Sequence, residues 1–245
     1  MKKVLIIIDN IIQYDRFKNV IKQKGRKDVK FIFKHSPIKS DIWNHPDFKD
    51  LIFSQIDVKK EYDYIIQNFN LIISVHCFQL FPSELVKKIR CINIHPGYNP
   101  INRGWYPQVF SIVHNLPIGA TIHEIDEKLD HGSIIARKFV NKYIWDTSFS
   151  IYNRVLNAEI ELFEEFFDLI IDSNYKIINP ENEGNIFLKK DFYELCKIDL
   201  EERGTFLDFY NKLRALSHGK YKNAWFEDPI SGKRIFLKLE IDYGE

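Results

Sequence analysis

The stretch Cys91-Ile92-Asn93-Ile94-His95-Pro96 is the most informative part of this chain. It predicts a strand over residues 91–95 that stops at Pro96, because proline cannot donate a hydrogen bond to a sheet ladder. Side chains two apart on a strand point to the same face, about 7 Å apart along it. Asn93 and His95 are therefore expected to project together from a strand end, where open α/β sheets bind ligands. Taken alone, the pair could equally be a buried Asn and His that bond to the backbone.

Apolar runs and helix-like segments alternate on the N-terminal side of this stretch. Three runs suit buried parallel strands, at Val4–Ile8, Val29–Phe33 and Leu71–Val75. Three segments suit helices, at Tyr14–Gln23, Val58–Gln67 and Ser83–Arg90. The alternation predicts an α/β fold with a doubly wound, mostly parallel sheet that is flanked by helices. Residues 35–56 contain two prolines and fit no single element.

The C-terminal side predicts a hairpin, a long helix and a small appendage. The alternating run Ala120–Asp126 and its partner Ser133–Val140 predict two paired strands. Asp146–Ser148 then offers an N-cap to a helix whose apolar residues recur at helical spacing as far as Ile170. A further helix and a strand pair are predicted at Phe206–Leu216, Ala224–Phe226 and Arg234–Leu239. We therefore expect a larger domain over residues 1–175 and a small helix-plus-hairpin subdomain over residues 176–245.

Two further segments place polar and aromatic side chains where they can meet Asn93 and His95. Residues 97–108 form a predicted loop, rich in Gly, Pro and Asn, that carries Tyr98, Arg103, Trp105 and Tyr106. The turn between the paired strands presents His123, Asp126 and Asp130, with Gly132 available for a positive φ. An Asp-x-Gly turn alone is weak evidence of a site, but its coupling to the other two segments is specific.

In these three segments the chain resembles the folate-dependent formyltransferases. The elements that agree in type, order and spacing are Asn93-Ile94-His95-Pro96, Arg103-Gly104, and the run from His123 through Asp126 and Asp130 to Gly132. The resemblance covers about residues 1–175, with Gly97-Tyr98 standing where many members have Ser-Leu. It implies the formyltransferase fold, 10-formyltetrahydrofolate as the formyl donor, and an amine as the acceptor.

The chemistry of three side chains supports that implied reaction independently. His95, with an ordinary pKa near 6.5, suits the removal of a proton from the attacking amine at neutral pH. Asn93 can donate its amide N–H to the formyl oxygen as that oxygen gains charge. Asp130 can orient His95 and favour its charged form. We therefore predict Asn93, His95 and Asp130 as the catalytic residues.

The resemblance also implies where the folate binds. In the family, the loop that corresponds to His76–Pro82 and the turn before the catalytic Asp line the pterin slot. The residues assigned to this role are Cys77, Phe78, Gln79, Leu80, Phe81, Ile125 and Asp126. The alternative is that the apolar members are simply core. A Cys–His nucleophile pair at His76-Cys77 is disfavoured, because adjacent residues on a strand face opposite ways.

The stretch Arg214–Trp225 suggests a nucleotide. Aromatic and basic side chains suit a base and its phosphates, although a solvated hinge is the alternative. The runs Arg-Ala-Leu-Ser (214–217) and Tyr-Lys-Asn-Ala (221–224) resemble the nucleotide-sugar branch of the family. This implies a homodimer that formylates a dTDP-linked 3- or 4-amino-dideoxy sugar for surface polysaccharide such as O-antigen, with 4-amino-4,6-dideoxyglucose preferred. Tyr98, Arg103, Trp105 and Tyr106 are assigned to the sugar and diphosphate, and Tyr221, Asn223 and Trp225 to thymine.

Charge limits the set of partners. The net charge of the 245 residues is +1, which gives no broad attraction to nucleic acid or to an anionic membrane. Residues 1–150 carry +7 and residues 151–245 carry −6, so a C-terminal RNA-binding module is disfavoured. Two alternatives stay open. One is a formyltransferase for initiator tRNA or a purine-pathway amine, and the other is a non-catalytic nucleotide-sugar binding protein.

Cysteine and histidine content bears on compartment and metal. The three scattered cysteines favour a reducing cytoplasm over a disulfide framework. The apolar run at Val4–Ile8 is too short for a signal core, and no run approaches the ~18 apolar residues of a membrane span. A zinc site from His95, His123, Asp130 and His131 is chemically conceivable. No short ligand pair anchors such a site, so we expect no metal.

Overall fold

A six-stranded sheet forms the centre of the structure, a computed structural model that describes residues 1–48 and 54–242. The strand order is β2 (Val29–Lys34), β1 (Lys2–Ile8), β3 (Leu71–Val75), β4 (Cys91–His95), β6 (Gly119–Glu124) and β7 (Ile134–Phe139). The first four strands pair in parallel, whereas β6 and β7 are antiparallel additions. The predicted α/β fold with a mostly parallel sheet is confirmed.

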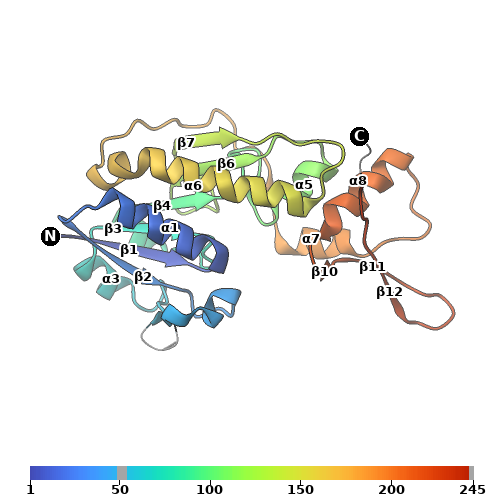
Figure 1. The fold of residues 1–245 in the computed structure, drawn as a ribbon, viewed down its shortest axis with the longest axis horizontal. Helices are drawn as coiled ribbons and strands as arrows, with labels where there is room; N and C mark the ends of the chain where they lie inside the picture. The colour runs from blue at the N-terminus through green and yellow to red at the C-terminus, as the bar shows by residue number, and fades with distance from the viewer. Residues whose placement is uncertain (49–53, 243–245) are drawn as a thin grey trace.

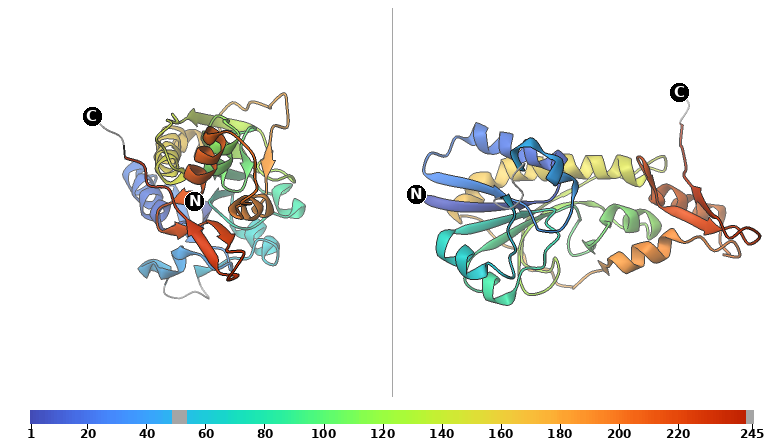
Figure 2. Two further views of the ribbon diagram at one scale, coloured as in Figure 1. Left: turned by 90° about the vertical axis from the view of Figure 1, so that its right-hand side faces the viewer. Right: turned by 90° about the horizontal axis from the view of Figure 1, so that it is seen from below.

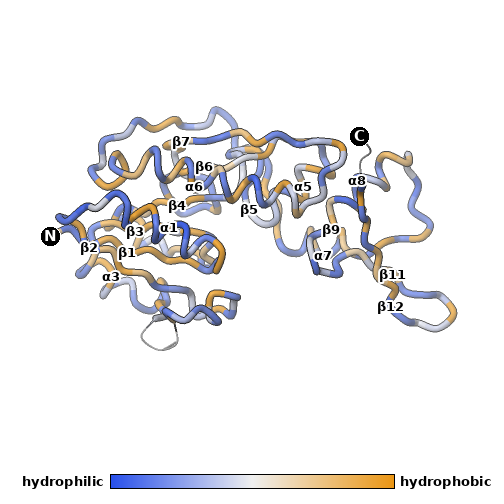
Figure 3. The backbone as a smooth tube through the Cα atoms, viewed as in Figure 1, coloured by the Kyte–Doolittle hydropathy of each residue, from blue (hydrophilic) through white to orange (hydrophobic). Residues whose placement is uncertain are grey.

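Both faces of the sheet are covered by helices. Along β1, Val4, Ile6 and Ile8 belong to one apolar cluster, whereas Leu5 and Ile7 belong to the other. The first cluster lies under α1 (Ile11–Lys24) and α6 (Ser148–Asp172), and the second under α3 (Tyr62–Asn68) and α4 (Ser83–Val86). Figures 1 and 2 show the two layers, and the strands between them are the most apolar part of Figure 3. Burial on both faces explains why these strands read as continuous apolar runs.

Local polar groups set the helix ends. Asn10 caps α1 by accepting hydrogen bonds from the backbone of Ile12 and Gln13, and Gly25 ends the helix with a φ of 61°. The predicted helix over Val58–Gln67 begins later, at Tyr62. The residues before it form a turn instead, in which Asp57 accepts hydrogen bonds from the backbone N–H groups of Lys59 and Lys60. The helix at Ser83 is also shorter than predicted and ends at Val86.

The segment with no sequence assignment contains two short 3-10 helices, at Asp41–Asn44 and Pro46–Phe48. Part of the same segment, residues 49–53, lies outside the described residues. Another helix that was not predicted, α5 (Pro107–Val113), includes the last two residues of the predicted loop, 107 and 108. It is buried almost throughout and packs against the first apolar cluster.

After α6 the chain returns along the sheet before it forms the appendage. Ile178 bridges Ile134, and β8 (Ile186–Phe187) pairs with β5 (Arg103–Gly104). The appendage itself contains α7 (Lys189–Cys196), α8 (Phe206–Leu216), β9 (Ser217–His218), β10 (Tyr221–Lys222), β11 (Ala224–Glu227) and β12 (Arg234–Leu237). It lies at the end of the molecule away from the N-terminus (Figure 1). The predicted α8 and the predicted β11–β12 pair are confirmed, whereas α7 was not predicted.

Candidate active site

Strand pairing brings the three predicted catalytic residues together. Asn93 pairs with His123 across β4 and β6, so the turn after β6 lies beside the end of β4. In that turn Asp130 accepts a hydrogen bond from Asn93 Nδ2 (3.0 Å to Oδ1). Its other oxygen, Oδ2, lies 3.6 Å from Nδ1 of His95. Residues nearly forty positions apart in the sequence thus form one polar cluster at a strand end.

The His95 ring is held from the side opposite Asp130. It is only 4% exposed, and Nε2 lies 2.9 Å from the backbone oxygen of Asn102. A carbonyl only accepts hydrogen bonds, so Nε2 carries the hydrogen and Nδ1 carries the lone pair in the neutral ring. Burial lowers the pKa of His95 and the Asp130 charge opposes that effect, with the balance below the ordinary value of 6.5. The ring is therefore neutral at pH 7.

Gly97 leaves the room that this arrangement needs. A Cβ at this position would lie 2.4 Å from His95 Nε2 and 2.5 Å from the Asn102 oxygen. The backbone carbonyl of Gly97 accepts a hydrogen bond from the Thr121 hydroxyl (2.7 Å), which ties the loop to β6. The chain departs from the family pattern at Gly97, and the space that a side chain would need there is filled by the His95 ring and the Asn102 oxygen.

The Asp130 side chain is only 11% exposed, and it is held as a carboxylate. Burial alone would raise its pKa, but His95, His123 and the N–H of Gly104 (3.0 Å) together hold the pKa well below the ordinary value of 3.8. The residue has a φ of 46°, a left-handed conformation that is uncommon outside glycine. Its own carbonyl accepts a hydrogen bond from the Asn99 amide (2.9 Å), which fixes the turn.

His123 is a member of this cluster to which the sequence assigned no role. Its Nδ1 lies 2.7 Å from the Glu124 carbonyl, so Nδ1 carries a hydrogen and Nε2 is an acceptor. Nε2 lies 3.3 Å from Asn93 Nδ2 and 3.6 Å from Asp130. The sequence did contain one signal for His123: it belongs to the matched motif and lies two residues before Ile125 on an alternating strand.

The predicted folate-binding residues come from two segments that share one support. Cys77, Phe81 and Ile125 all pack against the second apolar cluster. Buried Asp9 accepts hydrogen bonds from the backbone N–H of Phe78 (2.8 Å) and of Ser36 (2.8 Å), which fixes the loop after β3. The loop after β3 and the segment that leads to Asp130 therefore rest on the same apolar cluster.

The remaining members of that set have separate contacts. Gln79 accepts a hydrogen bond from Val58 N (2.9 Å) and donates one to Ile56 O (2.9 Å). Leu80 is 59% exposed. Asp126 accepts a hydrogen bond from Nδ1 of His131 (2.6 Å).

A Cys–His nucleophile at residues 76–77 does not form. His76 Nε2 pairs with the buried Glu159 carboxylate at 2.8 Å, away from Cys77. Burial raises the pKa of the Cys77 thiol to about 12, so it is not a thiolate at neutral pH. Within residues 1–48 and 54–242, no group of three His, Cys, Asp or Glu side chains could hold a metal ion.

The loop residues assigned to the sugar and diphosphate point in different directions. Arg103 is 6% exposed, and among the described residues its Nε and Nη1 have no hydrogen-bond partner. Tyr98 lies under the Arg137 guanidinium (4.7 Å) against the β6–β7 hairpin. Tyr106 stacks on Phe192 of α7, with ring centroids 3.9 Å apart. Trp105 instead lies on the side of the loop after β3, with its ring 5.6 Å from that of Phe78.

The residues assigned to thymine all lie in the appendage. Tyr221 is exposed, with its ring 6.0 Å from that of His218. Asn223 donates a hydrogen bond to the Leu216 carbonyl (3.0 Å). Trp225 packs under the Arg234 guanidinium (4.2 Å), and its carbonyl accepts from Ile198 N (2.7 Å). Asn223 and Trp225 thus stabilise the appendage itself, whereas Tyr221 presents an open ring.

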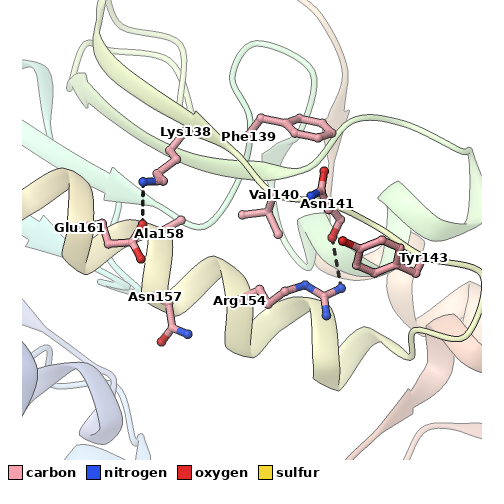
Figure 4. A pocket seen from close by; sticks show the side chains of 9 residues that line it. All are labelled: Lys138, Phe139, Val140, Asn141, Tyr143, Arg154, Asn157, Ala158 and Glu161. Carbon is pink, nitrogen blue, oxygen red and sulfur yellow. Dashed lines mark hydrogen bonds and ion pairs between the residues drawn. The ribbon is translucent and has the colours of Figure 1, made fainter.

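Two hollows of about 250 Å³ lie outside the cluster of Asn93, His95 and Asp130. Figure 4 shows the one between β7 and α6, where Lys138 pairs with Glu161 and Arg154 donates to the Asn141 carbonyl. The second lies between residues 179–183 and the turn at residues 131–133, and buried Arg103 forms part of its wall. Lys138 and Arg154 are already paired with acceptors of the protein itself.

Comparison with known proteins finds relatives along most of the chain. A family model described as "Formyl transferase" matches residues 7–166, and one described as "N-formyltransferase dimerization C-terminal domain" matches residues 191–243. The Mycobacterium tuberculosis protein named dTDP-4-amino-4,6-dideoxyglucose formyltransferase is 48% identical over 186 residues, which is 76% of this chain and 79% of that relative. No helix in the described part of the chain has the length and apolar character needed to cross a membrane.

Two solved structures match almost the full length of the chain. A sugar N-formyltransferase from a Shewanella species has a TM-score of 0.93 and 37% identity, with 100% of each chain covered. A 4-N formyltransferase from Francisella tularensis has a TM-score of 0.90 and 39% identity, with 99% of this chain and 98% of that chain covered. With a family model over more than half of its length and a relative of 48% identity, this chain belongs to the formyl transferase family, as its motifs predicted.

Proposed function

We propose that this chain is a sugar N-formyltransferase that moves a formyl group from 10-formyltetrahydrofolate to the amino group of dTDP-4-amino-4,6-dideoxyglucose. The observation that carries the proposal is the meeting of three side chains at one strand end, with Asp130 3.0 Å from Asn93 and 3.6 Å from His95. The name of the M. tuberculosis relative supports this acceptor. An N-formyl sugar of this kind suits the synthesis of surface polysaccharide such as O-antigen.

His95 is the proposed base. 10-Formyltetrahydrofolate supplies, when bound, the formyl carbon that the acceptor amine attacks. His95 takes the proton that the amine loses as the new C–N bond forms, and returns it to the folate nitrogen as the old C–N bond breaks. Because Asn102 fixes the hydrogen on Nε2, the atom that takes the proton is Nδ1. Asp130 faces Nδ1 and stabilises the resulting imidazolium.

Asn93 is the proposed partner of the formyl oxygen, which gains negative charge. Its amide nitrogen reaches Asp130 Oδ1 at 3.0 Å and His123 Nε2 at 3.3 Å, so both N–H hydrogens already have acceptors. The bond to His123 is the longer of the two and does not go to a carboxylate, so it is the weaker one. The N–H that faces His123 is therefore the one that the formyl oxygen can share or take over, while the other keeps Asp130 in place.

The donor fits between the loop at residues 77–81 and the segment Ile125–Asp126. A flat ring needs apolar contact on its faces and hydrogen-bonding groups at its edge. Cys77, Phe81 and Ile125 rest on one apolar cluster and supply the first. The backbone of this loop, fixed by Asp9 and Gln79, supplies the second.

On the acceptor side, we assign the rings of Trp105 and Tyr221 to the ligand. Trp105 directly follows Gly104, whose N–H binds Asp130, and is proposed to contact the sugar, and exposed Tyr221 is proposed to stack on thymine. The other predicted contacts shape the walls around them, namely Tyr98, Arg103, Tyr106, Asn223 and Trp225. In this arrangement residues 1–175 carry the chemistry and residues 176–245 contact the nucleotide.

We further propose a homodimer that works in the cytoplasm. The appendage falls within the family model for a dimerization domain, and it exposes large apolar side chains such as Phe206 and Phe236. Such side chains are typical of subunit contacts. The three cysteines are all free thiols, which suits a reducing compartment.

The decisive experiment is a transfer assay read by mass spectrometry. The purified protein is mixed with 10-formyltetrahydrofolate and, separately, dTDP-4-amino-4,6-dideoxyglucose, a dTDP-3-amino sugar, initiator methionyl-tRNA and a purine-pathway amine. We expect the mass of one formyl group to be added to the 4-amino sugar with the highest kcat/KM. Binding of dTDP without transfer to any acceptor, or preferred transfer to tRNA, would overturn the proposal.

A further inference from the structure

A lysine from the appendage lies on the aromatic pair beside the reacting side chains. Lys189 Nζ is 3.8 Å from the centre of the Trp105 ring and 5.7 Å from that of Phe78. Trp105 directly follows Gly104, whose N–H binds the Asp130 carboxylate at 3.0 Å. The cation therefore lies next to the loop that ends at the reactive centre, although it is distant in sequence.

Backbone pairing fixes this position. Arg103 N donates to Asn185 O (3.1 Å) and Trp105 N donates to Phe187 O (2.8 Å). These bonds join β8 to the loop that carries Trp105, just before Lys189. On the other side of the lysine, α7 is anchored by Phe192, which stacks on Tyr106 at 3.9 Å. Lys189 is thus held between two contacts to the same short loop.

The charge of Lys189 is not neutralised by the protein. No carboxylate lies within 4.0 Å of its Nζ in residues 1–48 and 54–242. The nearest acid in sequence, Asp191, instead accepts a hydrogen bond from Leu188 N (2.7 Å). Arg103, the cation that the sequence analysis assigned to the diphosphate, is 6% exposed and forms part of the wall of the second hollow. Lys189 is exposed, and so it can meet an anion.

We propose that Lys189 binds the diphosphate of the nucleotide-sugar acceptor, with the Trp105 ring holding its ammonium group in place. The inference rests on the proposed function and assigns the binding group for one part of that substrate. A diphosphate is a strong acceptor of charge-assisted hydrogen bonds, and a lysine ammonium is a common partner for it. Stacking on Trp105 reduces the freedom of a long side chain and so favours binding.

The test compares Lys189→Ala with Lys190→Ala in the full-length protein. Lys190 is the next residue, equally basic and exposed, and within residues 1–48 and 54–242 its ammonium group lies over no ring and pairs with no carboxylate, so it controls for loss of charge. We expect Lys189→Ala to raise the KM for the dTDP-amino sugar about 10- to 100-fold. The KM for 10-formyltetrahydrofolate and the melting temperature should stay near those of Lys190→Ala. Lys189→Arg should recover most of the acceptor affinity.

Binding of fragments locates the contact. In calorimetry with dTDP and with thymidine, Lys189→Ala should weaken dTDP alone, because thymidine has no phosphate. An unchanged acceptor KM, or an equal loss of dTDP and thymidine affinity, would overturn the inference while leaving the proposed function standing. If wild-type protein formylates no dTDP-amino sugar, the proposed function fails and this inference fails with it.

Discussion

The hydrogen on His95 is placed by Asn102, and this gives the enzyme a defined pH dependence. Burial lowers the pKa of His95 below 6.5, so the ring is a neutral base at pH 7 and becomes charged only in more acidic solution. We expect kcat/KM to be flat near neutrality and to fall on an acid limb whose midpoint lies below pH 6.5. A profile of kcat/KM between about pH 5 and 8 measures this directly.

The lowered pKa of His95 also makes the folded protein less stable in acid. The unfolded chain takes up a proton on this histidine at a higher pH than the folded protein does, so stability falls as the pH drops below 6.5. Asp130→Asn removes the charge that raises the pKa of His95, so any residual activity should have its acid limb at still lower pH. A limb that moves to higher pH in Asp130→Asn would contradict the arrangement described.

Gly97 gives a second prediction at this scale. In Gly97→Ala the new methyl group would meet His95 Nε2 and the Asn102 oxygen at about 2.5 Å, so the ring must move. We expect kcat to fall at least about 100-fold, with about 1–3 kcal/mol lost from the free energy of unfolding. Gly204→Ala, at a site where the nearest atom is a flexible carboxylate 3.3 Å away, is the matched control. Full activity in Gly97→Ala would show that the Asn102 contact is dispensable.

At the scale of elements, α6 carries a carboxylate into the core. Glu159 is fully buried and accepts hydrogen bonds from Gln13 (2.6 Å) and His76 (2.8 Å), which ties α6 to α1 and to the loop after β3. Glu159→Ala removes the carboxylate partner of His76 and leaves Gln13 Nε2 with only the Leu156 carbonyl (3.0 Å), so we expect a loss of about 3 kcal/mol in denaturant unfolding. Glu161→Ala breaks only the exposed pair with Lys138 and should cost less than about 1 kcal/mol. Equal losses would refute this account.

The elements also show what the sequence could and could not predict. Cys91–His95 and its neighbouring strands were predictable, because burial on both faces makes them continuous apolar runs. The helix α7 was missed because its register depends on packing of Phe192 against Tyr106, a contact made only after folding. The two-residue strands β5 and β8 carry no periodic signal, since a pattern needs more residues than they contain.

Single side chains in the site divide in the same way. Asn93, His95 and Asp130 were found because motif and strand geometry agree on their positions. The burial of Arg103 was not foreseeable, because an arginine in a loop can either bind a phosphate or pack inside the protein. Lys189 was overlooked because no local pattern marks a lysine that a distant strand pairing delivers to Trp105.

At the scale of the whole molecule, the exposed apolar side chains of the appendage predict an oligomer. Phe206 is 85% exposed at the start of α8, within the segment matched by the dimerization model. We expect light scattering after gel filtration to give the mass of a dimer, and Phe206→Asp to shift it toward the monomer. Ile38→Asp, at an exposed site outside that segment, should leave the mass unchanged. A wild-type monomer at tens of micromolar would contradict the prediction.

The pairing of β5 with β8 imposes an order on synthesis of the chain. When the ribosome has completed α6, at Asp172, the residues proposed as the base, the amide donor and the carboxylate have all been made. The strand that joins the tryptophan-bearing loop has not, since it begins at Ile186. A nascent chain can therefore bring these three side chains together before it can complete the proposed sugar-binding side of the site. That side is completed only in the last quarter of translation.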